Sequence, residues 1–407
     1  MKAGWETGTL AEVCQIKPPK AEARRQLSEM DLVSFAPMED LGIDQKFLAP
    51  TKTRLLAEVA GSYTYFADGD VLLAKITPCF ENGKLGIAAN LTNGIGFGSS
   101  EYIVFRPDAS VDKEWLYYFL SRESFRTEGV ERMSGAVGHK RVAKEFIEAY
   151  PIPVPPLPEQ QRIVALLDAA FDGIAKARVN AEKNLQNAHA LFESHLQSVF
   201  TQGGEGWEEK PLETVAEILN GYAFKSTDFS PKVGAKCIKI TNVGVREFVC
   251  ESDAYLPLGF AEKYHAVSVK KESIVIALTR TIIAGGLKVA VVPDEYDGAL
   301  LNQRVASIIS NHKYLTAPFL FAYLSTQNVV SYVTERVNTL MQPNLSVADL
   351  RAMPIPVPPL REQHQITDQL AGLRAESQRL ESLYQRKLSA LDALKKSLLH
   401  QAFNGQL

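Results

Sequence analysis

The chain has 407 residues, which is too long for one ordinary hydrophobic core and indicates two or three domains. Its 46% hydrophobic and 22% charged residues are typical of a soluble globular protein, and it has neither an apolar run that could cross a bilayer nor a signal-peptide layout, so we expect a cytoplasmic protein. The net charge of −3 argues against binding DNA mainly by neutralising phosphates, so any DNA contact must come from local patches or a more basic partner.

The first predicted domain, residues 1–150, carries 18 basic and 21 acidic side chains. Its β-rich runs Val71–Ala74 and Tyr102–Phe105 are separated by turn residues, and a short helix is expected at Trp115–Arg122. Gly94-Ile-Gly-Phe-Gly resembles a glycine-rich phosphate loop. We expect a β turn there instead, because a strand and not a helix follows.

Residues 151–203 form the first predicted spacer, in which a proline-rich lead-in, PIPVPPL, precedes a helix at 158–202. Pro158 is tolerated at a helix start, and Gly203-Gly204 ends the helix. Some 42 residues make a rod of roughly 60 Å. The lead-in is a stiff extended segment or, alternatively, a polyproline ligand for another protein. Apolar or small residues in alternating four-three spacing predict a coiled-coil seam at positions 163, 167, 170, 174, 177, 181, 185, 188, 192, 196 and 199.

The second predicted domain, residues 204–353, is again β-rich, and a short helix is expected at Pro318–Ser325. Residues 354–407 repeat the lead-in and continue as a helix at 361–403 that ends at Asn404-Gly405. Strands are expected at Cys237–Ile240, Ser273–Ala277, Leu287–Val292 and Val305–Ile309. The second seam is expected at 366, 370, 373, 380, 383 (or 384), 388, 391, 394 and 398.

An internal duplication organises the whole chain. PIPVPPL at 151–157 returns at 354–360, 203 positions later, and the same register continues through Glu159-Gln160 and Glu362-Gln363. Near the start of each half, Gly4-Trp5-Glu6 recurs as Gly206-Trp207-Glu208. We therefore predict an α+β fold with two duplicated α/β domains separated by two long antiparallel coiled-coil helices. The alternative is that each helix packs only on its own domain. The seam residues expected to matter most are Ile163, Leu167, Leu185, Leu370, Leu391 and Leu398.

Catalytic motifs are missing from the sequence. We find no Asn/Asp-Pro-Pro-aromatic motif of a methyltransferase, no Walker A sequence and no nuclease-like carboxylate–lysine cluster. The seven histidines never pair at ligand spacing; His189 is expected to be solvated and His195 to lie at the seam. The four cysteines, Cys14, Cys79, Cys237 and Cys250, are expected to be isolated buried thiols in a reducing compartment and not a metal site. We therefore expect no catalytic site, metal or cofactor in this chain.

The repeated motif Pro-x-Pro-x-Pro-Pro-Leu-x-Glu-Gln-x-x-Ile, at Pro151–Ile163 and Pro354–Ile366, resembles that of the specificity subunit of type I restriction–modification systems. Its order of target recognition domain, conserved helix, target recognition domain, conserved helix covers essentially the whole chain. Weaker matches are Trp5/Leu10/Glu12, Trp207/Leu212/Glu213, Gly69–Leu72, Leu219–Phe224 and Ile238–Asn242. Glu272-Ser273 stands where Gly69-Asp70 does, so the two domains have diverged.

The resemblance implies a non-catalytic subunit that reads a bipartite, asymmetric DNA target. It implies two adenine-N6 methyltransferase subunits and motor-nuclease subunits as partners. S-adenosylmethionine, ATP and Mg are then expected on those partner subunits. The domain boundaries expected are 1–150 and 204–353 for the recognition domains, and 151–203 and 354–407 for the lead-ins and spacer helices. The alternative function is a coiled-coil scaffold whose two modules bind proteins, with no DNA role.

Candidate DNA contacts are polar and basic side chains in the turns between strands, because such groups pair with base edges and phosphates. In the first domain they are Lys75, Thr77, Lys84, Ser99, Ser100, His139, Lys140 and Arg141. In the second they are Lys225, Thr279, Arg280, Lys288, Asn302, Gln303, Arg304, Gln342 and Asn344. The repeat places His139-Lys140-Arg141 over Gln342-Pro343-Asn344, so equivalent loops carry different hydrogen-bonding groups. For any single residue, an exposed polar loop remains the alternative to a base contact.

Overall fold

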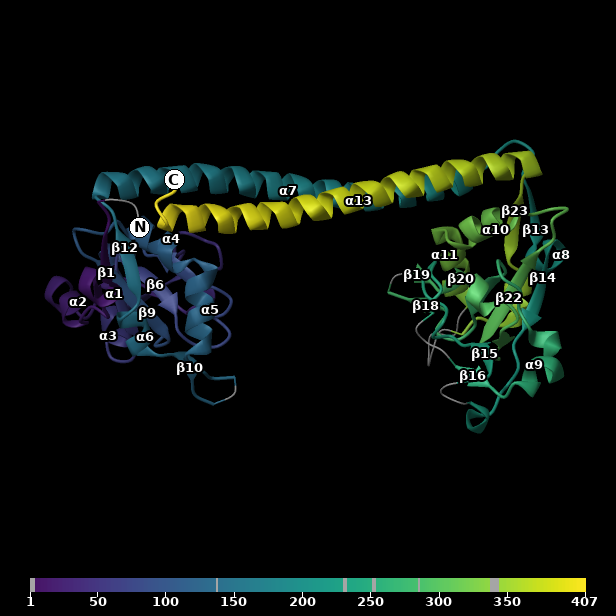
Figure 1. The fold of residues 1–407 in the computed structure, drawn as a ribbon, viewed down its shortest axis with the longest axis horizontal. Coiled ribbons are helices and arrows are strands. Elements are labelled where there is room, and N and C mark those ends of the chain that lie inside the picture. Colours follow the sequence, from purple (N-terminus) through teal and green to yellow (C-terminus); the bar gives the residue numbers. More distant parts are fainter. Residues whose placement is uncertain (1–3, 137, 230–232, 251–253, 285, 337–343) are drawn as a thin grey trace. The chain divides into compact units, whose positions relative to one another are not determined.

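The computed structural model describes residues 4–136, 138–229, 233–250, 254–284, 286–336 and 344–407. The chain divides into two compact units, Met1–Glu182 with Gln385–Leu407, and Lys183–Tyr384. Each unit joins one α+β domain to the beginning of one long helix and the end of the other (Figure 1). This confirms the predicted fold class. We call the segment from β1 to β12 domain 1 and the segment from β13 to β23 domain 2.

Domain 1 is built on two four-stranded sheets, ordered β2-β9-β6-β7 and β4-β3-β8-β5. The first sheet contains β2 (Cys14–Ile16), β9 (Tyr102–Pro107), β6 (Val71–Ala74) and β7 (Leu85–Ile87). The second contains β4 (Lys52–Leu55), β3 (Leu32–Ala36), β8 (Ile95–Gly98) and β5 (Thr64–Ala67). The helices are α1 (Leu10–Val13), α2 (Ala21–Gln26), α3 (Leu56–Val59), α4 (Lys113–Leu120), α5 (Glu123–Glu131) and α6 (Lys144–Glu148), and a small hairpin joins β10 (Met133–Ser134) to β11 (Arg141–Val142).

Domain 2 repeats the first of these sheets, ordered β14-β22-β17-β20. Its strands are β14 (Ala216–Asn220), β22 (Val305–Ser310), β17 (Ile274–Ala277) and β20 (Val289–Val291). A three-stranded sheet, β16-β15-β21, and a hairpin, β18-β19, complete the domain. Their bounds are β15 (Ala235–Ile238), β16 (Tyr255–Leu256), β18 (Ile282–Ile283), β19 (Gly286–Leu287) and β21 (Leu300–Leu301); the helices are α8 (Leu212–Val215), α9 (Gly259–Lys263), α10 (Ala317–Leu324), α11 (Gln327–Arg336) and α12 (Val347–Arg351).

The shared sheet keeps its register between the two domains. Val71 pairs with Phe105 in domain 1, and Ile274 pairs with Ile308 in domain 2; both residues of the pair are shifted by 203 positions. Because a slip of one residue would turn every side chain to the opposite face, the common register shows that both copies bury the same faces. The predicted strands at 71–74, 102–105, 273–277 and 305–309, and the two short helices, are confirmed to within two residues.

The proline lead-ins are strands that close each domain. β12 (Pro151–Val154) pairs antiparallel with β1 (Glu6–Thr9), and β23 (Pro354–Val357) pairs with β13 (Glu208–Pro211). The lead-in is therefore extended, as the stiff-segment interpretation predicts, and it joins the start of each domain to its end. Prolines are tolerated there because each pair is a sheet of two edge strands.

The long helices are α7 (Leu157–Gln202) and α13 (Leu360–Phe403). They pack antiparallel within each unit: Arg178 of α7 pairs with Asp392 of α13 in the first unit, and the Ser377 hydroxyl donates to the Ala188 carbonyl in the second. Burial along α7 follows the first predicted seam. Ile163, Leu167, Ile174, Ala181, Ala188 and Leu196 are buried, and the remaining predicted positions, Leu185 included, are half-buried.

The second seam was predicted less well. Ile366 and Leu370 are buried and Leu391 and Leu398 are half-buried, but Leu383 and Leu394 are 37% and 46% exposed. Tyr384, the predicted alternative to Leu383, is half-buried. Regular four-three spacing also places Ser377 and Lys395 at the seam, two positions that were not predicted. Ser377 is buried, and Lys395 lies 5.6 Å from the ring centre of Phe171. His189 is exposed as predicted. His195 is exposed as well, so its expected seam position was wrong.

Two further predictions need correction. Gly94 ends a turn, but Ile95–Gly98 form strand β8, in which Gly96 and Gly98 leave the room that the rings of Phe66 and Tyr102 occupy. Cys14 and Cys237 are buried, and burial raises the pKa of each thiol to about 12, whereas Cys79 is half-buried and Cys250 is exposed. Among the described residues, no cluster of His, Cys, Asp and Glu could hold a metal ion, and no helix is long and apolar enough to span a membrane.

Candidate nucleic-acid interface

Three turns of domain 1 that carry candidate residues meet beyond the end of β6. The Lys75 amide donates to the Glu101 carbonyl (2.9 Å), and the Thr77 amide donates to the Lys140 carbonyl (3.0 Å). The Lys75 ammonium also donates to the Ser100 carbonyl (2.9 Å). The structure therefore brings Lys75, Thr77, Ser100 and the β10–β11 hairpin together, although they are up to 67 positions apart in the sequence.

Arg141 makes the shorter of the two ion pairs in this cluster, since Lys75 lies 3.9 Å from the Glu101 carboxylate and Arg141 lies 2.7 Å from it. Its guanidinium makes two hydrogen bonds to the Glu101 carboxylate, at 2.9 and 2.7 Å. The pair holds the pKa of Glu101 below its usual range, chiefly through the hydrogen bond from Arg141. Because the Arg141 guanidinium is already paired with a carboxylate, it can contact a guanine only if its hydrogen bonds to Glu101 break. Glu101 was not singled out from the sequence, because nothing near it in the chain reveals its partner.

The other candidates of domain 1 divide by exposure. His139 and Lys140 are exposed in the hairpin. The Ser99 hydroxyl accepts from the Glu101 amide (3.2 Å), so it shapes the turn that carries Ser100. Lys84 is half-buried and its ammonium donates to the Met38 carbonyl (2.6 Å), which directs it to a backbone group of its own domain.

In domain 2 a comparable cluster forms beyond the end of β17. Thr279 pairs with Asn344, and the Leu278 amide donates to the Arg304 carbonyl (2.8 Å). Arg280 is exposed with a φ of 50°. Lys288 donates to the Ile240 carbonyl, and burial followed by the charge of Arg280 lowers its pKa. Gln342 lies outside the described residues.

The turn at 302–304 carries three of the candidates and rests on the segment after β14. The Gln303 amide donates to the Tyr222 carbonyl (2.9 Å), and Asn302 accepts from the Arg304 amide (3.3 Å) through its side chain. Gln303 and Arg304 are exposed. Lys225 is also exposed, beside the short helix η3 (Ser226–Asp228), but no hydrogen bond joins it to this turn in the described residues.

One position that resembles the family pattern has a structural role. Asp70 is 1% exposed and accepts two hydrogen bonds from Arg106, at 2.7 and 2.8 Å. Burial raises the pKa of Asp70 even so. Gly69 before it has a φ of +91°, and Glu272 occupies the equivalent left-handed position in domain 2 with a φ of +65°. The backbone is shared by both domains, while the buried ion pair belongs to domain 1.

The glutamines of the duplicated Glu-Gln pair make equivalent buried hydrogen bonds in the two units. Gln160 and Gln363 are both fully buried. Each accepts from one backbone amide, of Asp112 or Thr316, at 2.8 Å. Each donates to two carbonyls, those of Ser110 and Pro155 or of Tyr314 and Pro358. One side chain at the start of each long helix thus satisfies the lead-in and the turn before α4 or α10.

The end of each long helix is anchored by aromatic packing. In the first unit Phe403 of α13 lies 4.3 Å from Trp115 and 5.3 Å from Phe119, between ring centres. In the second, Phe200 of α7 lies 5.2 Å from Phe319 and 5.3 Å from Tyr323. Each domain is therefore attached both to the helix that follows it and to the end of the helix from the other half of the chain.

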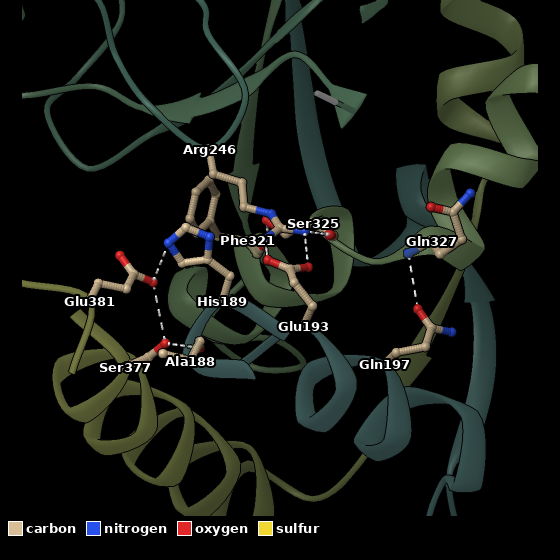
Figure 2. A network of polar contacts seen from close by, with 10 residues as sticks. All are labelled: Ala188, His189, Glu193, Gln197, Arg246, Phe321, Ser325, Gln327, Ser377 and Glu381. Atoms are coloured by element: carbon tan, nitrogen blue, oxygen red, sulfur yellow. Dashed lines mark hydrogen bonds and ion pairs between the residues drawn. The ribbon is translucent and has the colours of Figure 1, made fainter. Parts of the chain in front are cut away.

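Different ion pairs connect the domain to helix α7 in the two units. In the second unit Arg246, with a φ of 58°, donates to both carboxylate oxygens of Glu193 on α7 and to the Ser325 carbonyl at the end of α10 (Figure 2). Gln197 of α7 accepts from the Gln327 amide (3.0 Å) beside this network. In the first unit Lys46 pairs with Glu114 and with Asp168 of α7, and Tyr118 donates to Asp168.

Comparisons with known proteins agree with this architecture. A family model described as the type I restriction modification DNA specificity domain matches residues 2–183 and again 204–385. The chain is 26% identical to the type I restriction enzyme EcoAI specificity subunit of Escherichia coli, over 96% of this chain and 82% of that protein. It is 27% identical to the MjaVIII specificity subunit of Methanocaldococcus jannaschii, over 73% and 71%. The fold is similar to the HsdS subunit of Thermoanaerobacter tengcongensis, with a TM-score of 0.70 at 18% identity over 100% of this chain and 98% of that one.

Proposed function

Because this chain belongs to the family of type I restriction–modification DNA specificity subunits, the non-catalytic subunits that determine the DNA target, we propose that it reads a bipartite, asymmetric target. Domain 1 reads one half-site and domain 2 the other. Family membership favours this function over a coiled-coil scaffold with two protein-binding modules.

The observation that carries the proposal is the contrast between shared framework and different surface groups. The two domains have the same sheet register and the same buried glutamine, yet the turns beyond β6 and β17 carry different polar side chains. The residue types differ between the two domains. Domain 1 carries His139, Lys140 and Arg141 in these turns, whereas domain 2 carries Thr279, Arg280 and Asn344. Different donor and acceptor sets read different bases, so the two half-sites differ in sequence.

The proposed assembly has the long helices as its platform. Two adenine-N6 methyltransferase subunits bind them, motor-nuclease subunits join the complex, and S-adenosylmethionine, ATP and Mg are held by those partners in the cytoplasm. The helices expose apolar side chains outside the seam that support this: Leu166, Val179, Leu191 and Leu394 are 47%, 62%, 45% and 46% exposed. The fold is also similar to that of a chain from a structure of a type I restriction–modification system that concerns complex assembly and conformational transition. The TM-score is 0.76 at 18% identity.

Domain exchange tests the proposal. Residues 1–150 are replaced by the first domain of another specificity subunit, and methylated sites are mapped genome-wide in a host that also carries the cognate methyltransferase. We expect only one half of the methylated motif to change. A change in both halves, or in neither, would show that the domains do not act as independent readers. The reciprocal exchange of residues 204–353 is the matched control and changes the other half.

The helices are proposed to set the distance between the half-sites, which we expect to be separated by an unread gap of about six to eight base pairs. Four residues inserted into each helix, near 180 and 383, lengthen the pair by about 6 Å, close to two base-pair steps. Matched insertions keep the antiparallel seam aligned. The measurement is again the methylated motif. Retention of the original gap by a methylating variant rules out the helices as the ruler.

A further inference from the structure

Domain 1 contains a cleft of about 480 Å³ whose lining is unusually basic for an acidic domain. Four lysines line it, Lys17, Lys20, Lys75 and Lys144, and Glu148 is its one lining carboxylate. Glu148 pairs with Lys144 at 3.1 Å, and Glu101, outside the lining, lies 3.9 Å from Lys75. Among the described residues, Lys17 and Lys20 have no carboxylate partner. We call these four residues with the cleft between them the lysine cleft.

Backbone groups position Lys17, Lys20 and Lys75, and a backbone group removes none of their charge. The Lys20 ammonium donates to the Gly61 carbonyl (2.8 Å) and that of Lys75 to the Ser100 carbonyl (2.9 Å). Lys17 has a φ of 60°, and its amide donates to the Val104 carbonyl (2.8 Å). A carbonyl takes up one of the three donors of an ammonium and removes none of its charge. The cleft is therefore a fixed arrangement of cations with donors to spare.

The cations are close enough to repel one another. Burial lowers the pKa of Lys20, and the charges of Lys17 and Arg24 lower it further. Burial also lowers the pKa of Lys75, with contributions from Arg141 and Lys17 that oppose the effect of Glu101. An anion with several oxygens that binds between like positive charges relieves their repulsion and lowers the free energy of the site.

The position of the lysine cleft relates it to the candidate interface. Val142 lines the cleft, and its amide donates to the Lys75 carbonyl (3.0 Å) directly beside Arg141 of the β10–β11 hairpin. We propose that the lysine cleft binds backbone phosphates of duplex DNA next to the half-site that the hairpin reads. The inference rests on the proposed function. Phosphate contacts of this kind fix register and orientation but carry no sequence information.

At two of its four lysine positions, the lysine cleft has no basic counterpart in domain 2. At the shared register, Leu278 stands where Lys75 does, directly after the equivalent strand. Val347, the first residue of α12, stands where Lys144 begins α6. The proposal therefore predicts that domain 1 contributes a salt-dependent, sequence-independent part of the affinity that domain 2 does not supply at these positions.

The test changes the two exposed lysines, because Lys20 and Lys75 also bond the backbone. The full chain with Lys17→Gln and Lys144→Gln is co-expressed with its methyltransferase. Fluorescence anisotropy at several salt concentrations follows binding to two duplexes of 30 base pairs (about three turns). One duplex contains the methylated motif and the other has a shuffled sequence. The control, Lys52→Gln with Lys113→Gln, removes the same charge from two exposed lysines elsewhere in domain 1.

We expect the cleft variant to lose the same factor of affinity on both duplexes. Its slope of log K against log salt should be shallower by about one for each lysine, while the control keeps the wild-type slope. A slope equal to that of the control overturns the proposal. So does a loss confined to the motif duplex, which would make these lysines base contacts. If the wild type itself fails to prefer the motif, the proposed function fails while the slope still decides the fate of the lysine cleft.

Discussion

The two places where a domain meets the long helices have kept some contacts and exchanged others. Both retain a fully buried glutamine with the same three hydrogen bonds, and both retain a phenylalanine at the helix end against an aromatic pair. The ion pairs differ. Glu193 of α7 pairs with Arg246, whereas Lys396, 203 positions later on α13, pairs with Glu123.

The difference follows from what each contact is worth. A buried amide that loses its partners costs the full desolvation of those groups, and a buried ring that is removed leaves a cavity. A half-exposed ion pair contributes little, so its sign can reverse without loss of the fold. Glu193 is 51% exposed, and Lys396 and Glu123 are 61% and 55% exposed. The buried contacts between domain and helices are therefore the same in both copies, whereas the exposed ion pairs around them differ.

Removal of the helix-end phenylalanines should have the largest effect. Phe200→Ala and Phe403→Ala each should lower the free energy of unfolding by about 3–5 kcal/mol, because each ring is almost fully buried among aromatic rings. Urea denaturation measures the loss, and hydrogen exchange assigns it to one unit. The control Leu394→Ala removes a side chain that is 46% exposed and should change little. A much smaller loss at one phenylalanine would show that the joints are not equivalent.

The buried glutamines should come next. Gln160→Leu and Gln363→Leu remove three hydrogen bonds each and leave one amide and two carbonyls unpaired, a cost of about 2–3 kcal/mol. The two losses should agree, because the bonds agree. Gln161→Leu, one position along the helix and exposed, is the control. Thermal melting of the four proteins makes the comparison. Unequal losses at 160 and 363 would contradict the shared role.

The ion pairs should separate the two joints. Lys46→Ala leaves the carboxylates of Glu114 and Asp168 facing each other, so it should cost about 1–2 kcal/mol. Arg246→Ala leaves Glu193 half-exposed and able to hydrate, so it should cost about 1 kcal/mol or less. Adding Glu114→Gln should recover part of the Lys46→Ala loss. Equal effects in urea denaturation, with no recovery, would remove the distinction.

The smallest effect concerns the rim pair of the first unit. The hydrogen bond from Lys396 holds the pKa of Glu123 below its ordinary 4.5. A carboxyl with a lowered pKa in the folded state stabilises it above the unfolded pKa, and this contribution disappears as the pH falls through the folded pKa. Lys396→Gln should therefore raise the pKa of Glu123 toward 4.5, as followed by NMR titration. An unchanged pKa would mean that the pair does not persist in solution.

Periodicity and repetition in the sequence were enough to predict the duplicated α+β fold and the two long helices, whose four ends all agree to within one residue. These features depend on local spacing, which is visible in one dimension. In the second seam, Leu394 was wrong, and of the two alternatives at 383 and 384 the tyrosine is the half-buried one, because the contact surface of a helix follows its regular turn and not its leucines. Ser377 and Lys395 occupy further seam positions through contacts that no hydrophobicity pattern marks.

The sequence by itself determined that this chain is a tandem duplication with a polar, turn-rich surface in each copy, because a repeat and its turn residues are legible without coordinates. Only the tertiary structure decided which of those polar residues meet. In the structure, Lys75 and Ser100 lie together, and Arg141 beside them is paired with Glu101. The ammonium of Lys84 donates to a backbone carbonyl. Lys17, Lys20 and Lys144 line the same cleft as Lys75. Such groupings depend on strand order and sheet register across long separations, and neither is encoded in the neighbours of a single residue.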